Sequence, residues 1–156
     1  MEKIGKRRRG KWMGLLLMLL LVWLCGCDRK WPMNGALDGQ WQLLTVETRA
    51  DGVVTDRKDE QLYFRFQLQL MMLTDLGGNG YGTYVGRMTY DQETQVVQTQ
   101  EMNVRTNSGD SGIAATAEQL APFGLDNGVT RFEVVKADGD HLILESDYAR
   151  LTLRKF

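Results

Sequence analysis

The chain has 156 residues, of which 43% are hydrophobic, and this suits one domain with one core, so that no second domain is required. Its formal net charge of −1 hides an uneven distribution. Residues 1–26 hold six of the 19 basic and one of the 20 acidic side chains, which leaves 13 basic and 19 acidic ones, a balance of −6, in residues 27–156. This acidic balance argues against nucleic acid as a partner and against electrostatic adhesion to anionic lipid.

The N-terminal segment has the order of parts that is typical of a secretion signal. A basic stretch that ends at Lys11 precedes thirteen uncharged residues, from Trp12 to Leu24. As a helix this run would span about 20 Å, against a hydrocarbon core of roughly 30 Å. It is too short for a comfortable membrane span, so residues 1–26 are expected to be a signal peptide that is cleaved.

The end of this segment, Leu24-Cys25-Gly26-Cys27, resembles the lipobox of bacterial lipoproteins. In that motif an aliphatic residue stands three positions before the cysteine and a small residue directly before it. The resemblance implies cleavage between Gly26 and Cys27, lipidation of Cys27, and attachment to a membrane through N-terminal acyl chains. The alternative is a signal anchor with two buried, inert cysteines. Neither cysteine falls within the expected domain, so packing alone must stabilise it.

Residues 27–37 contain Pro32 and an Asn-Gly pair and show no periodicity, which indicates a lipidated tether. The domain is therefore expected over residues 38–156. Short turn motifs recur along it and indicate hairpins. They are Asp51-Gly52, residues 77–80, 91–93 and 107–109, Asn127-Gly128 and Asp138-Gly139.

Between these turns the hydrophobic residues repeat with a period of two, which is typical of strands with one buried face. The clearest case places Leu62, Phe64, Phe66, Leu68 and Leu70 on one face of a single strand. The expected strands cover residues 40–48, 62–70, 82–90, 95–104, 130–136, 141–146 and 149–156. Seven or eight hairpin-connected strands of this kind predict an all-β antiparallel barrel or sandwich.

One segment departs from the strand pattern. Thr116 and Gln119 have the spacing of a capping box, and Pro122 followed by Gly124 ends any helix early. A short helix is therefore predicted over residues 116–121.

The first expected strand opens with Gly39-Gln40-Trp41, which resembles the Gly-x-Trp motif that begins the barrel of lipocalins, where the Trp plugs one end. With its C-terminal hairpins, the chain resembles the lipocalin-like lipoproteins abundant in Bacteroidales, most of which have no assigned function. The resemblance implies an up-and-down barrel of about 7–8 strands. It also implies a basic side chain over Trp41, and Arg150 or Arg154 is expected to make this cation–π contact.

Two motifs invite a catalytic or metal-binding interpretation. Gly109-Asp110-Ser111-Gly112 is similar to the nucleophile motif of chymotrypsin-like proteases, but the only histidine follows the serine instead of preceding it, so a surface loop is expected. That histidine, His141, lies near Asp138 and Asp140, and any further metal ligands would all be carboxylates, so a hairpin turn is expected. No catalytic residue, metal site or cofactor is predicted.

Together these features predict a lipid-anchored cell-envelope protein whose barrel is a non-enzymatic binding module for a small apolar ligand or an envelope protein. The alternative is a structural or assembly subunit with a filled barrel that works by surface contacts; an enzyme ranks third. Asp28-Arg29-Lys30 departs from the acidic run that sends many Bacteroidales lipoproteins to the cell surface. The periplasmic face of the outer membrane is therefore the expected location, and surface exposure is the alternative.

Overall fold

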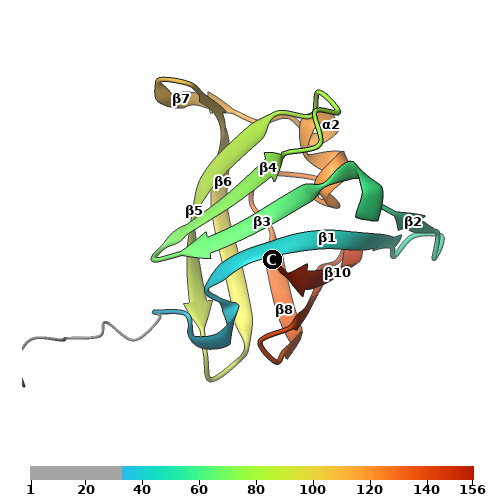
Figure 1. The fold of residues 1–156 in the computed structure, drawn as a ribbon. Coiled ribbons are helices and arrows are strands. Elements are labelled where there is room, and N and C mark those ends of the chain that lie inside the picture. Colours follow the sequence, from blue (N-terminus) through green and yellow to red (C-terminus); the bar gives the residue numbers. More distant parts are fainter. Residues whose placement is uncertain (1–32) are drawn as a thin grey trace, which may run out of the picture. The chain divides into compact units, whose positions relative to one another are not determined.

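The computed structural model describes residues 33–156, whose strands form one antiparallel sheet that closes into a barrel (Figure 1). Eight strands, β1, β3, β4, β5, β6, β8, β9 and β10, follow one another around the barrel in chain order, and β10 pairs with β1 to close it. Two further strands in this part of the chain extend the sheet: β2 pairs with β1, and β7 pairs with β6. The predicted all-β, up-and-down antiparallel barrel is confirmed.

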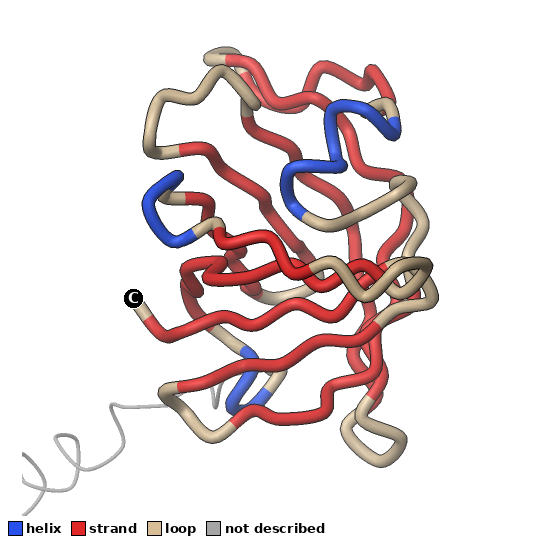
Figure 2. Tube along the Cα trace, turned by 90° about the vertical axis from the view of Figure 1, so that its right-hand side faces the viewer, coloured by secondary structure: helices blue, strands red, loops and turns tan. Residues whose placement is uncertain are grey.

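Short helical segments interrupt the strands, and those at the two ends of the barrel are visible in Figure 2. The strands are β1 (Gly39–Thr48), β2 (Val54–Asp56), β3 (Leu62–Gln67), β4 (Leu70–Asp75), β5 (Thr83–Asp91), β6 (Val96–Thr106), β7 (Gly109–Ala114), β8 (Arg131–Ala137), β9 (His141–Glu145) and β10 (Ala149–Lys155). The helical segments are the α-helix α2 (Ala117–Leu120) and the 3-10 helices η1 (Gly35–Leu37), η2 (Lys58–Glu60) and η3 (Ala121–Phe123).

The predicted short helix is confirmed together with its capping box. The Thr116 hydroxyl accepts a hydrogen bond from the Gln119 backbone N–H at 3.3 Å, and the Gln119 side chain accepts one from the Thr116 N–H at 2.9 Å. Pro122 then lies in η3, and Gly124 ends that segment in the left-handed conformation with φ 77°. The chain thus turns sharply enough to lie across the end of the barrel.

The predicted single strand over residues 62–70 is wrong, because the chain reverses after Gln67 and β4 begins at Leu70. Leu68 and Gln69 form the turn, with Leu68 at φ 56°, as in the first central position of a type II′ turn. Since Gln67 pairs with Leu70, both side chains point outward, and Leu68 and Leu70 are 57% and 45% exposed. Leu68 and Leu70 continue the alternation of apolar residues that begins at Leu62. The sequence pattern therefore gave no sign of the turn.

Besides β4, which the predicted strand over residues 62–70 reaches only at Leu70, two further strands have no counterpart in the predicted elements. β2 has three residues, and β7 occupies Gly109–Ala114, where a surface loop was expected. Residues of both strands are exposed or only half-buried, so neither carries an apolar face that a pattern could reveal.

The predicted signal peptide, residues 1–26, with its expected cleavage between Gly26 and Cys27, and the predicted lipidation site Cys27 lie outside the described residues. The folded body begins at Asn34, within the range predicted as a tether: Asn34 and Leu37 are buried against the barrel. Among residues 33–156 no helix has the length and apolar character needed to cross a membrane.

Candidate functional site

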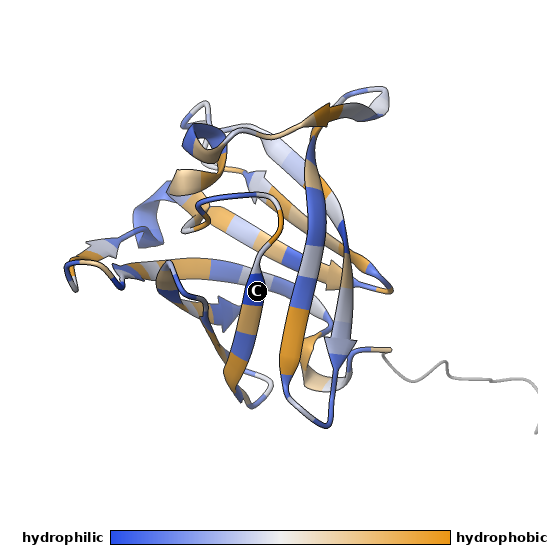
Figure 3. Ribbon diagram, turned by 180° about the vertical axis from the view of Figure 1, so that it is seen from behind, coloured by the Kyte–Doolittle hydropathy of each residue, from blue (hydrophilic) through white to orange (hydrophobic). Residues whose placement is uncertain are grey.

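The interior of the barrel is occupied by its own side chains. Hydropathy alternates along the strands (Figure 3), and the inward residues form one core cluster with η1, α2 and η3. A space that admits water would expose part of the side chains around it, yet the largest inward side chains have essentially no exposed surface. The fully buried aromatic ones are Trp41, Phe64, Phe66, Phe123 and Phe132. The barrel is therefore filled along its axis, as expected for a small eight-stranded barrel.

One end of the barrel is covered by α2, η3 and the residues that follow. Phe123 packs edge-to-face on Phe64 and on Tyr84, with ring centroids 6.3 and 5.9 Å apart. Leu120 and Leu125 on either side of it are also fully buried. These apolar contacts close this end.

The opposite end is covered by η1 and by a stack built on Trp41. The Trp41 indole N–H donates a hydrogen bond to the Leu37 carbonyl at 2.8 Å, which holds η1 across the opening. The Lys155 ammonium lies 4.2 Å from the centroid of the Trp41 ring and donates to the Asp38 carbonyl at 2.6 Å. Burial lowers the pKa of Lys155, and the nearby Asp38 carboxylate acts in the opposite direction.

The cation over Trp41 is thus Lys155, and this corrects the expectation of Arg150 or Arg154. Successive side chains of a strand point to opposite faces, and on β10 Lys155 shares its side with the buried Leu153. Arg150 and Arg154 have the other parity and point away from the interior.

Both arginines instead bind partners on the outer surface of the barrel. Arg150 forms an ion pair with Glu145 at 2.6 Å. Arg154 donates two hydrogen bonds to the side-chain oxygen of Gln42, at 3.0 and 2.8 Å. They join neighbouring strands from outside and take no part in closing the end.

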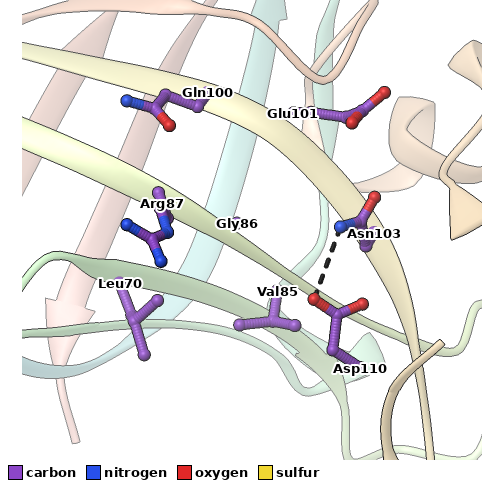
Figure 4. A pocket seen from close by; sticks show the side chains of 8 residues that line it. All are labelled: Leu70, Val85, Gly86, Arg87, Gln100, Glu101, Asn103 and Asp110. Atoms are coloured by element: carbon purple, nitrogen blue, oxygen red, sulfur yellow. Dashed lines mark hydrogen bonds between the residues drawn. The ribbon is translucent and has the colours of Figure 1, made fainter. Parts of the chain in front are cut away.

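An outer groove of about 400 Å³ runs over the outside of β4, β5, β6 and β7 (Figure 4). Asn103 donates a hydrogen bond to the Asp110 carboxylate at its far end, and Arg87 lies between Leu70 and Gln100. The groove is lined by Leu70, Val85, Gly86, Arg87, Gln100, Glu101, Asn103 and Asp110. The groove is mostly polar and combines two apolar side chains, Leu70 and Val85, with both signs of charge.

Three arginines of this face form no ion pair with a carboxylate within residues 33–156: Arg65, Arg87 and Arg105. Arg65 and Arg105 line a second cavity that adjoins the groove and shares Leu70 and Val85 with it. By contrast, four arginines elsewhere, Arg49, Arg57, Arg131 and Arg150, each pair with a glutamate. Arg154 on β10 also forms no ion pair within residues 33–156 and binds Gln42 instead, so three of the four arginines without an ion pair in this range lie on this face.

The groove opens toward an apolar rim, which consists of Met33, Leu68 and Leu70. These three residues, with Gln69 and Arg87, line a further cavity, and they are 53%, 57% and 45% exposed. Asn34 fixes the start of the chain there, because its side-chain amide donates to the Leu68 carbonyl at 2.8 Å. The described chain therefore begins beside the turn between β3 and β4.

The residues of the two other motifs have structural roles. The Ser111 hydroxyl donates to the Val104 carbonyl at 2.6 Å and so supports the pairing of β7 with β6. The His141 backbone N–H donates to the Asp138 carboxylate at 2.7 Å in the hairpin between β8 and β9. Within residues 33–156, no group of three His, Cys, Asp or Glu side chains is placed to hold a metal ion.

Neither Lys155 nor the outer face was found from the sequence. The signal for Lys155 is its even spacing from Leu151 and Leu153 on the last strand. The only sequence sign of the outer face is Val85, an apolar residue among polar outward positions of β5. Leu70 gave no sign, because the predicted strand over residues 62–70 places it on the inner face.

Comparison with known proteins identifies the family of this barrel. The family model described as a lipocalin-like domain matches residues 20–156. A crystal structure of a lipocalin-like protein from Bacteroides uniformis is similar, with a TM-score of 0.55 and 23% identity over 78% of this chain and 100% of that one. An uncharacterized protein from Bacteroides eggerthii gives a TM-score of 0.55 and 18% identity over 77% and 99% of the two chains.

No curated protein matches the chain. At 18–23% identity the two solved structures show a shared fold alone. The family match spans most of the chain and agrees with the closed eight-stranded barrel. The chain belongs to the lipocalin-like domain family.

Proposed function

We propose that this protein is a lipid-anchored binding module of the cell envelope that performs no reaction and holds another envelope protein in its outer groove. The filled interior carries the proposal, because the fully buried aromatic side chains leave no room for an apolar ligand on the barrel axis. A filled barrel can bind a partner only on its outer surface. The outer groove is a site there that combines apolar side chains with charged ones.

The composition of the groove favours a partner segment with acidic and apolar side chains. Arg87 and Arg105 form no ion pair within residues 33–156 and would pair with carboxylates. Leu70 and Val85 line the same cavities as these arginines and would make apolar contacts with the partner. Glu101 and Asp110 would repel a purely anionic partner, which favours a mixed segment.

The anchor is proposed at Cys27, from the resemblance of Leu24-Cys25-Gly26-Cys27 to a lipobox. The proposed location is the periplasmic face of the outer membrane. Mass spectrometry of the protein purified from membranes is expected to find Cys27 as the acylated first residue, and a free thiol or an uncleaved leader would refute the anchor. Protease treatment of intact cells is expected to leave the domain uncut if it faces the periplasm.

The groove is tested by photo-crosslinking in cells that produce the full chain. A photoreactive residue at Val85 is expected to give one discrete crosslinked adduct, which Arg87→Glu removes. The control is Val135 on β8, an outward residue that is more exposed than Val85 and lies away from the groove. Equal adducts from both positions, or none from Val85, would refute the groove as the binding surface.

The interior is tested separately by native mass spectrometry. The expected result is a mass without a retained organic molecule. A co-purifying apolar compound that is lost when Phe123→Ala or Phe66→Ala disturbs the core would instead support an internal ligand.

A further inference from the structure

We propose that the apolar rim, Met33, Leu68 and Leu70, docks onto the anionic lipid surface in which the chain is anchored. This inference rests on the lipid anchor of the proposed function and goes beyond it, because it assigns a second, reversible membrane contact to the folded domain. It also fixes which side of the barrel faces the bilayer.

The first argument is the length of chain between the anchor and the rim. Only residues 28–32 separate Cys27 from Met33, and an extended chain spans at most about 3.5 Å per residue. An acylated Cys27 would therefore hold Met33 within about 20 Å of the lipid headgroups. Since Asn34 is buried and tied to Leu68, the turn between β3 and β4 is held at the same distance.

The second argument is the exposure of the rim itself. Three large apolar side chains are about half exposed and line one cavity at the point where the described chain begins. Leu68 occupies a turn position with φ 56°, where glycine or asparagine would fit without strain. A leucine there is unfavourable for both the backbone and the solvent, and membrane insertion gives its side chain an apolar environment.

The third argument is the local charge. Arg65 and Arg87 lie beside the rim without ion pairs in residues 33–156, and Arg29 and Lys30 precede it in the sequence. Acidic groups lie at this edge too, because the Asp38 carboxylate accepts hydrogen bonds from Asn34, and Gln92, which binds the Met33 carbonyl, stands between Asp91 and Glu93. Charges more than about 8 Å away are screened at physiological salt, so the negative charge of the whole domain does not decide the interaction, and Arg65 and Arg87 are the groups that would meet lipid phosphates. Apolar side chains flanked by arginine match a surface of acyl chains and lipid phosphates.

The test uses the acylated protein in vesicles of phosphatidylethanolamine and phosphatidylglycerol that contain a nitroxide-labelled lipid. An environment-sensitive dye is attached through Gln69→Cys in the rim turn or, as the matched control, through Ser108→Cys. Ser108 is exposed in the turn between β6 and β7, and Figure 1 shows β7 at the end of the barrel opposite the start of the described chain. Quenching is expected to be several-fold stronger at position 69 than at position 108.

Two substitutions separate docking from mere proximity. Leu68→Asn suits the left-handed backbone, so the fold is kept, and it is expected to reduce quenching at position 69 several-fold. Ile113→Asn on β7, an equally exposed apolar residue far from the rim, is expected to leave it unchanged. Phosphatidylcholine vesicles should weaken the quenching at position 69, because the arginines lose their anionic partners.

The outcomes distinguish the rim from the anchor. Acylated protein whose quenching is equal at the two positions, or is insensitive to Leu68→Asn, overturns the docking and leaves the anchor intact. Protein without acyl chains on Cys27, measured by mass spectrometry of the same sample, overturns the anchor and the docking together.

Discussion

At the residue scale, the contact between Trp41 and Lys155 explains why the motif at the start of the barrel begins with glycine. Gly39 has φ +121°, and a Cβ atom there would lie 2.4 Å from the Lys155 ammonium. A larger residue would push the lysine off the indole. The Gly-x-Trp motif predicts the role of Trp41, but it does not say which cation covers the ring. The last strand has three basic residues, and only Lys155 lies on the same face as the buried Leu151 and Leu153.

Replacing Lys155 with methionine keeps the apolar stem but removes the charge over the ring and the hydrogen bond to Asp38. The free energy of unfolding is expected to fall by about 1 kcal/mol. Urea unfolding followed by circular dichroism measures this, and Lys58→Met, at an exposed position on η2, serves as the control. If the two variants lose the same stability, the cation–π contact contributes nothing.

At the scale of the element, hairpins show where sequence patterns succeed and where they fail. The hairpin between β8 and β9 was predicted from Asp138-Gly139, whose residue types specify the turn locally. The hairpin between β3 and β4 was missed, because Leu68 and Gln69 are poor turn formers and the register of the surrounding strands imposes their conformation. A turn that is held by tertiary pairing leaves no local signal.

Asp138 makes the hairpin between β8 and β9 sensitive to acid. The Lys136 ammonium, 2.9 Å away, and the His141 backbone N–H hold the pKa of Asp138 well below its usual range. Below about pH 5 the unfolded chain therefore binds more protons than the folded one, so this contribution to stability is present above that pH and is lost as the pH falls.

The expected result is that Asp138→Asn lowers the urea midpoint at pH 7, and that its difference from the unsubstituted protein shrinks toward pH 3. Asp126→Asn, an exposed aspartate without an ion pair in residues 33–156, is the control and should show little difference at either pH. A difference for Asp138→Asn that stays constant across this range would contradict the assignment.

At the scale of the whole molecule, most of the barrel could be predicted because its strands alternate between one core and solvent. The alternation alone could not distinguish a closed barrel from a sandwich, and the filled interior and the outer groove could not be predicted. They depend on which strands pair and on how side chains from different strands fill the barrel axis. Both bring together residues that are far apart in the sequence, so no local pattern reports them. The Gly-x-Trp resemblance pointed to the barrel family, but it carried no information on whether Phe123 and Phe132 leave space between them.

The filled interior predicts what removal of one plug would do. Phe123→Ala should leave a cavity beneath η3 and lower the free energy of unfolding by about 3–5 kcal/mol. Because the cavity would be lined by apolar groups such as Phe64 and Tyr84, it should also take up xenon or benzene, and the unsubstituted protein is expected to take up neither. Unchanged stability, or equal uptake by both proteins, would show that the barrel already contains open space.

The seam between β1 and β10 joins the two ends of the domain, with Trp41 paired to Lys155 and the Lys155 ammonium bound to a carbonyl 117 positions earlier in the chain. Such contacts between distant residues form late in folding. A chain that folds from its N-terminus therefore cannot close the barrel before β10 is available to pair with β1. Loss of β10 as a whole should leave an open sheet with two bare edges, vulnerable to proteases and to aggregation.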